Sequence, residues 1–329
     1  MSSTGVAATS APASAALPSI RARIDPGRDY IRAPLIAPLL RLNDAGHAGY
    51  HLRVPVNGET PLVARELLAD DYCLLTFRHP EVAQAARPGQ FVMIKPGASA
   101  ELPLRRPFSI LAVDREQATF SLFVKRVGAN SRALSQLCPG EVATCLGPLG
   151  RPFAAPPPGA VPLLIAGGYG VAPLIFLARE LMRDGHLPCL FYGGRSAKDL
   201  ALAGMTEALG TPVHFATNDG SRGQAGLVTE SLERHLDAYS QPAALYACGP
   251  QPMLRAVARI AETRGLPAQL SLDPWMGCGV GICLSCVVRL RRAGEARAKY
   301  RCACTEGPVI DAHEIVWDEP ADATREEAR

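Results

Sequence analysis

The chain has 329 residues, of which 48% are hydrophobic and 20% are charged, and its formal net charge is +3. This length accommodates two ordinary domains with tails, and the composition is that of a globular protein rather than a disordered one. The low net charge and the lack of a long basic run argue against a nucleic-acid partner.

The N-terminal segment, residues 1–60, is expected to be disordered or to remain unassigned to a domain. Residues up to about 35 are rich in Ala, Ser, Pro and Arg without a sustained period, and residues 36–60 are ambiguous. The start has neither the basic region nor the continuous apolar core of an export signal, although its Arg content and few acidic residues also fit an organelle transit peptide. We expect a cytoplasmic protein with reduced cysteines.

Residues 61–155 have the pattern of short strands. Runs of β-branched and aromatic residues alternate with Gly, Pro and Asp, and they occupy residues 66–80, 89–97, 105–113 and 119–127. This spacing predicts an antiparallel barrel or sandwich. The sequence Pro-Pro-Pro-Gly at 156–159 marks a stiff boundary after it.

From residue 160 to 265 the period changes to alternating strands and helices. Strands are predicted at 161–168, 188–194, 213–219 and 243–250, and helices at 171–185, 197–210, 231–239 and 253–265. Alternating units of this length indicate an α/β domain with a doubly wound parallel sheet.

One uncharged stretch, residues 161–178, has the minimum length of a membrane span. Gly167, Gly168, Gly170 and Pro173 interrupt its middle. A buried strand, a glycine turn and a helix account for these residues better, so we expect no membrane association.

Five of the ten cysteines crowd together near the C-terminus. Cys278, Cys283 and Cys286 have the C-x4-C-x2-C spacing of plant-type [2Fe–2S] centres, and the fourth ligand is either Cys302 or Cys304. Interspersed glycines at 277, 279 and 281 permit the tight turns that aim backbone N–H groups at sulfur. A structural zinc site is the main alternative to an iron–sulfur cluster, and structural thiols that bind no metal are a further alternative.

Three strand ends in the α/β region are candidate nucleotide contacts. They carry Gly167-Gly168-Tyr169-Gly170, Arg195-Ser196 and Cys248-Gly249-Pro250. Ligands of open α/β sheets bind at the carboxyl ends of strands, where backbone N–H groups and helix dipoles attract phosphate. A glycine turn made only for packing is the alternative for the first of them.

A third candidate site is the sequence Arg105-Arg106-Pro107-Phe108-Ser109, which belongs to a predicted strand of the barrel. An Arg and a Ser three residues apart can hold a flavin or a diphosphate, because the guanidinium offers a fork of donors. A basic edge strand without a ligand would have the same sequence.

Together these motifs resemble the ferredoxin–NADP reductase superfamily, and they are most similar to its family of electron-transfer subunits of bacterial NAD-dependent dihydroorotate dehydrogenases. The resemblance runs from about residue 65 to 312. Besides the motifs above, it rests on Pro88-Gly89-Gln90-Phe91-Val92, Gly147-Pro148-Leu149-Gly150 and Cys304-Thr305-Glu306-Gly307-Pro308-Val309.

The resemblance implies the organisation of the whole chain. An FAD-binding β-barrel is expected at 61–155, an NAD-binding α/β domain at 160–265, a [2Fe–2S] segment at 270–315 and a charged tail at 316–329. The cofactors implied are FAD, a [2Fe–2S] cluster and NAD(H) as co-substrate.

The resemblance also implies roles for single residues. Arg106, Pro107, Phe108 and Ser109 would contact FAD, and Gly128, Asn130 and Ser131 would hold its diphosphate. Gly167, Gly168, Gly170, Cys248, Gly249 and Pro250 would bind the nicotinamide nucleotide. Cys278, Cys283, Cys286 and Cys304 would ligate the cluster, since Cys304 matches the family's Cys-x-x-Gly-Pro-Val motif.

Two features depart from the family. Asn130 and Ser131 replace the second Gly and the Thr of the usual Gly-x-Gly-Thr turn, and an arginine-rich insertion occupies residues 289–299. Asn tolerates positive φ and Ser keeps a hydroxyl, so FAD binding should survive. The insertion separates Cys286 from both candidate fourth ligands, Cys302 and Cys304.

By this resemblance the chain is an oxidoreductase subunit of pyrimidine biosynthesis, with no catalytic residues of its own for dihydroorotate. A flavin converts between two-electron hydride and the single electrons of a cluster. An FMN-containing dihydroorotate dehydrogenase catalytic subunit is the implied partner, in a heterotetramer. The alternatives are an NAD(P)H-dependent reductase subunit for a hydrogenase, ferredoxin or oxygenase, and a non-redox regulatory module with zinc. The direction of electron flow and the choice between NAD and NADP stay open.

Overall fold

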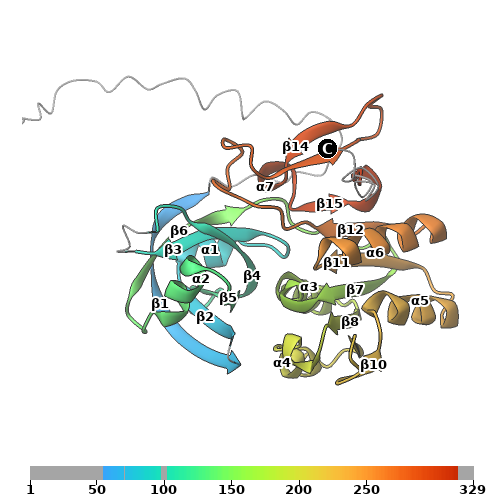
Figure 1. The fold of residues 1–329 in the computed structure, drawn as a ribbon, viewed down its shortest axis with the longest axis horizontal. Helices are drawn as coiled ribbons and strands as arrows, with labels where there is room; N and C mark the ends of the chain where they lie inside the picture. Colours follow the sequence, from blue (N-terminus) through green and yellow to red (C-terminus); the bar gives the residue numbers. More distant parts are fainter. Residues whose placement is uncertain (1–54, 70, 98–101, 318–329) are drawn as a thin grey trace, which may run out of the picture. The chain divides into compact units, whose positions relative to one another are not determined.

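The computed structural model describes residues 55–69, 71–97 and 102–317 (Figure 1). The expectations for residues 1–54 and for the tail from residue 318 lie outside these described residues.

The first folded part is a closed antiparallel barrel with strand order β1-β2-β5-β4-β3-β6. Its strands are β1 (Val56–Ala69), β2 (Tyr72–Arg78), β3 (Phe91–Pro96), β4 (Arg106–Asp114), β5 (Thr119–Lys125) and β6 (Val142–Leu149). Buried and half-buried residues alternate along β6, as expected for a strand with one face on a core. The inner face is filled by large apolar side chains such as Phe77, Phe120 and Ile110.

The barrel differs from the prediction in three details. β1 begins at Val56, inside the segment 1–60 that the sequence left unassigned. The run 66–80 is not one strand, since it divides between β1 and β2, which pair as an antiparallel hairpin. Two short helices, α1 (Pro80–Ala85) and α2 (Ala129–Gln136), were not predicted, because they are too short to show a helical period.

The second folded part is a seven-stranded sheet with order β10-β9-β8-β7-β11-β12-β15. All neighbouring strands are parallel except β12 and β15. The strands are β7 (Val161–Gly167), β8 (Cys189–Gly194), β9 (Val213–Thr217), β10 (Gln224–Ala225), β11 (Ala243–Cys248), β12 (Ala268–Ser271) and β15 (Val309–Asp311). The main helices are α3 (Val171–Arg183), α5 (Val228–Ala238) and α6 (Gln251–Arg264).

The uncharged stretch 161–178 contains β7, a short 3₁₀ turn and most of α3, as predicted. Among the described residues, every helix is too short or too polar to cross a membrane.

The predicted helix at 197–210 is wrong. Its residues form a 3₁₀ turn at Ala197–Asp199 and a short helix, α4 (Ala203–Glu207). Leu200 leaves the helical region with φ −94° and ψ 45°, and its side chain is buried. The Asp199 carboxylate accepts hydrogen bonds from the backbone N–H and the guanidinium of Arg195, which holds the turn in place of a regular first turn.

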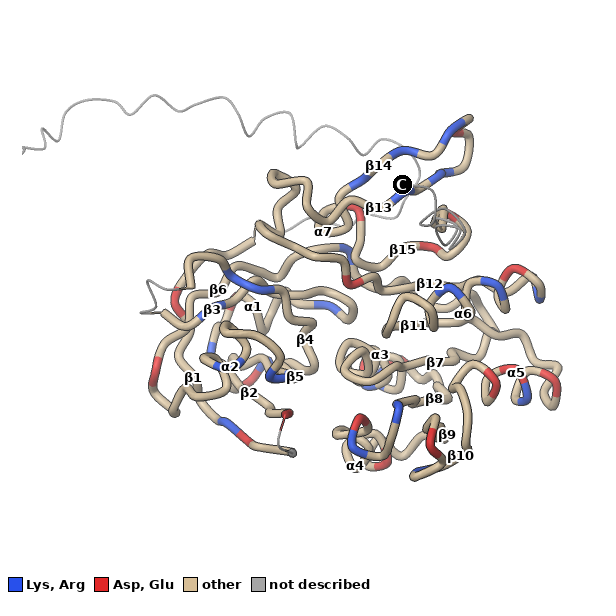
Figure 2. Tube along the Cα trace, viewed as in Figure 1, with Lys and Arg blue, Asp and Glu red and all other residues tan. Residues whose placement is uncertain are grey.

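The C-terminal segment joins both folded parts. After β12 comes the cysteine loop, then a hairpin of β13 (Val287–Leu290) and β14 (Lys299–Cys302), then α7 (Ala303–Glu306) and β15. The arginine-rich insertion therefore forms the turn and part of both strands of a separate two-stranded sheet. Figure 2 shows basic residues along this hairpin.

Candidate functional site

The cysteine loop packs directly on the barrel. Phe91 and Met93 of β3, Leu149 of β6 and Met276 form one buried apolar cluster with three of the cysteines. Gly279 has φ +76°, and a Cβ at this position would lie 2.5 Å from the Cγ atom of Met93. A glycine is needed here both for the backbone angle and for the close approach to β3.

All five C-terminal cysteines lie in this region. Cys286, Cys302 and Cys304 are buried, Cys278 is half-buried and Cys283 is exposed. Backbone N–H groups point at two of the sulfurs. The amides of Val280 and Cys283 lie 3.4 Å from the Cys278 Sγ, and the amide of Gly281 lies 3.1 Å from the Cys304 Sγ.

Such N–H donors fit thiolates that ligate a metal, because they offset negative charge on sulfur. The Ser285 hydroxyl lies 3.1 Å from the Cys283 Sγ and lowers the pKa of that thiol to about 6. Burial raises the pKa of the Cys304 thiol to about 12, and a metal ion that binds this sulfur would displace its proton.

The sequence spacing of the thiols fits a two-iron cluster better than a single zinc ion. Cys278, Cys283 and Cys286 have the C-x4-C-x2-C spacing of plant-type [2Fe–2S] centres, whereas structural zinc sites more often use two separated C-x2-C pairs.

The surroundings of Cys302 and Cys304 differ. The Cys304 Sγ accepts a hydrogen bond from the Gly281 amide, whereas the Cys302 Sγ lies 4.0 Å from the Gly281 carbonyl oxygen. A carbonyl oxygen repels a thiolate and an amide attracts one. This geometry favours Cys304 as the fourth ligand, and the assignment stays a prediction.

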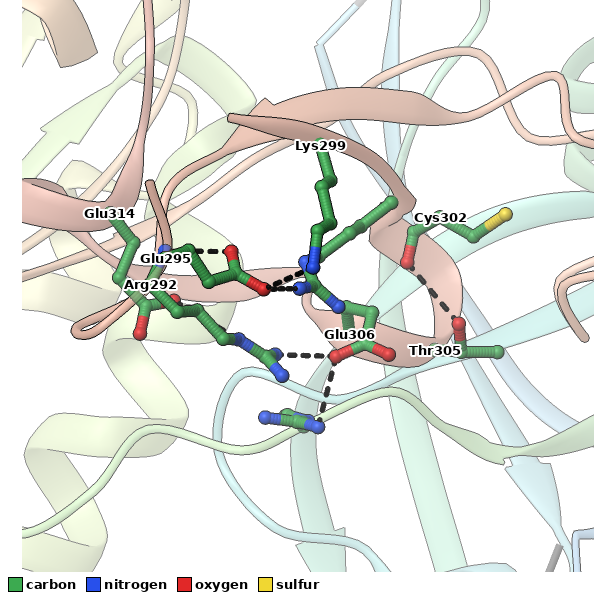
Figure 3. A network of polar contacts seen from close by, with 9 residues as sticks. Arg292, Glu295, Lys299, Cys302, Thr305, Glu306 and Glu314 are labelled. Atoms are coloured by element: carbon green, nitrogen blue, oxygen red, sulfur yellow. Dashed lines mark hydrogen bonds and ion pairs between the residues drawn. The ribbon is translucent and has the colours of Figure 1, made fainter. Parts of the chain in front are cut away.

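An ion-pair network, which the sequence analysis did not predict, holds the turn that carries Cys304 (Figure 3). Glu306 of α7 accepts hydrogen bonds from Arg151, which follows the barrel, and from Arg292 of the hairpin turn. Glu295 in the same turn pairs with Lys299 and Arg301 of β14. The sequence signal for this network was the alternation of charges in the insertion. The pairs formed by Glu306 could not be read from it, because Arg151 and Arg292 are far from each other and from Glu306 in the sequence.

The candidate flavin residues lie on β4 and at the start of α2. Arg106 is exposed, and its guanidinium contacts the carbonyl oxygen of Arg105 at 3.4 Å. Asn130 is buried, its side-chain amide lies 3.4 Å from the Leu104 carbonyl oxygen, and its Oδ1 atom has no hydrogen-bond partner among the described residues. The contact with Leu104 brings the α2 turn beside the segment that leads into β4. An unpaired buried acceptor there fits a missing polar ligand such as FAD.

Ser131 acts within the protein. Its hydroxyl oxygen accepts hydrogen bonds from the amides of Val127 and Gly128, each at 3.0 Å, and so closes the turn before α2. Gly128 has open space where a Cβ would be. Because the Ser131 hydroxyl is engaged by these contacts, a diphosphate would bind the free backbone amides of the turn rather than this hydroxyl.

The candidate nucleotide glycines divide into two groups. Added Cβ atoms at Gly167 and Gly249 would overlap Met253, and one at Gly170 would overlap the Cys248 carbonyl. These three glycines let the turns after β7 and β11 pack together, which is the alternative role considered for the turn. Gly168 is open, with φ +55°, and can approach a ligand.

Asp273 was not singled out from the sequence. It follows β12, and its carboxylate lies 3.5 Å from the Tyr169 hydroxyl at the glycine turn. Desolvation raises the pKa of the Asp273 carboxyl above its usual value although the residue is exposed, and burial raises the pKa of Cys248 to about 12. No spacing in the sequence connects residues 169 and 273, since the sheet alone brings them together.

This arrangement defines a class of protein. A closed antiparallel barrel, a parallel sheet with ligand-binding strand ends and a cysteine loop on the barrel make a flavin-, nicotinamide- and iron–sulfur-dependent oxidoreductase. The family models agree. The oxidoreductase FAD-binding domain matches residues 59–153, the oxidoreductase NAD-binding domain matches 164–259, and the iron–sulfur cluster binding domain of dihydroorotate dehydrogenase B matches 273–316.

More specifically, the chain belongs to the family of dihydroorotate dehydrogenase B electron transfer subunits. The electron transfer subunit of dihydroorotate dehydrogenase B (NAD⁺) from Desulforamulus reducens is 36% identical over 260 residues, which is 79% of this chain and 98% of that protein. The subunit from Bacillus caldolyticus is 38% identical and covers 78% of this chain and 96% of its own length.

Among solved structures, the NADH-dependent reduced ferredoxin-NADP oxidoreductase, which was described for flavin-based electron bifurcation, is also similar. Its TM-score is 0.69 at 29% identity, over 78% of this chain and 90% of that one. The predicted fold class, oxidoreductase function and cofactors are thereby confirmed, and the alternative of a non-redox zinc module is not supported.

Proposed function

We propose that this chain passes electrons between a dihydroorotate-oxidising catalytic partner and NAD through its [2Fe–2S] and FAD sites. One observation carries the proposal. The cysteine loop touches Met93 at Gly279, and Met93 pairs with Pro107 in the strand of Arg106 and Ser109. Adjacent strands lie about 4.8 Å apart, so the cluster site and the candidate flavin strand are immediate neighbours.

The chain's own residues hold and separate the cofactors. Cys278, Cys283, Cys286 and Cys304 would bind the cluster, while Arg106 and the α2 turn would bind FAD. FAD supplies the exchange between hydride and single electrons when it is bound. The open Gly168 turn and the neighbouring strand end of Cys248 would receive the nicotinamide nucleotide, so the three sites follow one another along the fold.

The structure also supports the choice of NAD over NADP. Arg195, which follows β8, is the basic side chain available for a 2′-phosphate in the predicted motif. Its backbone amide and its guanidinium both donate to Asp199, at 3.2 and 3.3 Å. The Asp199 carboxylate there would repel a 2′-phosphate, and its side-chain oxygens suit a ribose hydroxyl.

The partner is an FMN-containing dihydroorotate dehydrogenase catalytic subunit, in a heterotetramer with this chain. The three family models are all models of cofactor-binding domains, which leaves dihydroorotate chemistry to a second subunit. Trp275, Ile282 and Leu284 of the cysteine loop expose 92%, 80% and 62% of their surface. Exposed large apolar side chains beside the cluster suit a protein interface.

The test is reconstitution from purified subunits. Alone, the chain should oxidise NADH with an artificial acceptor and show no dihydroorotate turnover. Dihydroorotate-dependent reduction of NAD⁺ should appear when the FMN-binding subunit is added. Dihydroorotate oxidation by the isolated chain would contradict the two-subunit proposal.

A second candidate function is a reductase subunit that exchanges electrons with ferredoxin. The structural similarity to the NADH-dependent reduced ferredoxin-NADP oxidoreductase favours it. Co-purification from the native cell distinguishes the two candidates. Recovery of a dihydroorotate dehydrogenase catalytic subunit supports the first, and recovery of a ferredoxin or its larger reductase complex supports the second.

A further inference from the structure

A second group of metal-ligating side chains lies far from the cysteine loop in sequence. Cys189, His214 and His235 bring one thiol and two imidazoles together, with their ligand atoms all within 4.8 Å of one another. Cys189 is the first residue of β8, and His214 is near the start of β9. The group is therefore at the opposite end of these strands from the nucleotide turns, which follow their carboxyl ends.

Each of the three residues is placed by regular secondary structure. Phe191 pairs with His214 in the parallel ladder, and Cys189, two residues before Phe191, lies on the same face of the sheet. Helix α5 packs on this face. His235 is three residues beyond the buried Leu232, so it shares the sheet-facing side of the helix.

Aromatic contacts fix the two imidazoles. The ring of His214 stacks on Phe191 at 4.9 Å with an interplanar angle of 15°. The ring of His235 meets Phe191 edge-on at 5.2 Å and lies tilted by 33° against the Tyr239 ring at 4.5 Å. No hydrogen bond within the described part of the chain engages the Cys189 thiol or the nitrogens of either imidazole, so the donor atoms are free to bind a ligand.

We propose that Cys189, His214 and His235 form a Zn²⁺ site that links β8, β9 and α5. Thiolate and imidazole donors suit zinc, whereas Mg²⁺ and Ca²⁺ prefer oxygen. A tetrahedral zinc site needs ligand atoms about 3.2–3.8 Å apart, and the three donor atoms already lie within 4.8 Å of one another before a metal ion draws them together. Three protein ligands leave the fourth position for water, on the side where His214 is exposed.

The alternative is a packed group of aromatic and histidine rings without a metal. Both interpretations account for the stacking on Phe191, but only a metal site requires the thiol and both imidazoles together. The two are separated by zinc content, measured independently of iron.

The experiment uses the full chain with its FAD and iron–sulfur cluster in place. The protein is treated with a mild chelator, titrated with Zn²⁺ by calorimetry, and analysed for zinc and iron by elemental mass spectrometry. We expect about one zinc ion per chain beyond the iron. Replacing either histidine, as His214→Ala or His235→Ala, should weaken zinc binding at least about tenfold with unchanged iron and FAD content.

Two control variants show where the zinc binds. His313→Ala removes a histidine elsewhere in the chain, at an exposed position after β15, and should leave zinc binding intact. Cys278→Ser damages the cluster site and should also leave it intact, which excludes zinc that has entered the cluster site. Zinc binding that is absent from the wild-type chain, or that survives both histidine variants, would overturn the proposal, and its loss in Cys278→Ser would place the zinc at the cluster site instead.

Discussion

Replacing Gly279 by alanine should loosen the cysteine loop from the barrel and make the cluster less stable. Two costs add at this position. The φ of +76° is unfavourable for an L-residue by about 1–2 kcal/mol. The new Cβ would also lie 2.5 Å from the Met93 Cγ and 3.0 Å from a Leu149 methyl group, and overpacking of this kind costs about 1–3 kcal/mol.

Gly294 provides a matched control for the first cost. It has φ +83°, close to that of Gly279, and no atom lies within 4 Å of an added Cβ. Gly294→Ala therefore carries the backbone strain and the unfolded-state entropy change but not the steric overlap. The difference between the two variants isolates the close contacts with Met93 of β3 and Leu149 of β6, at about 1–3 kcal/mol.

The assay follows iron content and visible absorption during thermal or chelator challenge, with FAD retention as a check on the barrel. Gly279→Ala should lose the cluster well before Gly294→Ala does. Adding Met93→Ala to Gly279→Ala should restore part of the loss, since it removes the overlapping side chain. Equal cluster stability in the two glycine variants would refute the reasoning that the loop is held by close packing on β3.

Three further predictions test the remaining parts of the site. Cys302→Ser should leave the visible absorption of the cluster intact and Cys304→Ser should abolish it; the reverse pattern would reassign the fourth ligand. Arg106→Ala should weaken FAD binding about ten- to a hundredfold, because a charge-assisted contact is worth about 1.5–3 kcal/mol, and unchanged flavin retention on dialysis would count against this role. Glu306→Gln should weaken the ion pairs with Arg151 and Arg292 by at most about 1 kcal/mol each, since these groups are partly exposed. The rate of cluster loss in this variant should respond less to added salt than in the wild type. An identical salt response would show that the network does not support the Cys304 turn.

The fold was largely predictable because its signals are local. The β-branched runs of the barrel repeat within each strand, and the strand–helix alternation after residue 160 repeats within each unit. The spacing of Cys278, Cys283 and Cys286 is likewise contained in one loop. Such patterns reflect periodicity and turn geometry, which act over a few residues.

The errors arose where distant contacts override the local pattern. The residues at 197–210 have a helical period, yet Asp199 bonds back to Arg195 and also receives the Tyr72 hydroxyl from the barrel at 3.3 Å. Gly167, Gly170 and Gly249 stay predicted nucleotide contacts, and added Cβ atoms there would also strike neighbouring turns, a packing requirement that the sequence does not show. In the segment 197–210, tertiary contacts determine the structure, and the sequence does not record the partners.

The fourth cluster ligand shows the same limit at the site itself. Cys302 and Cys304 are two residues apart, both are buried, and either would satisfy a spacing rule. What separates them is a backbone segment more than twenty positions away, since Gly281 directs its amide at Cys304 and its carbonyl at Cys302. That segment turns at Gly281, which has φ +80°, and a Cβ at this position would lie 3.0 Å from the Thr305 methyl carbon. The ligand choice therefore depends on how the loop and α7 pack together, so a Gly281→Ala variant should disturb the cluster even though all five cysteines remain, and iron content measured beside Gly294→Ala would reveal it.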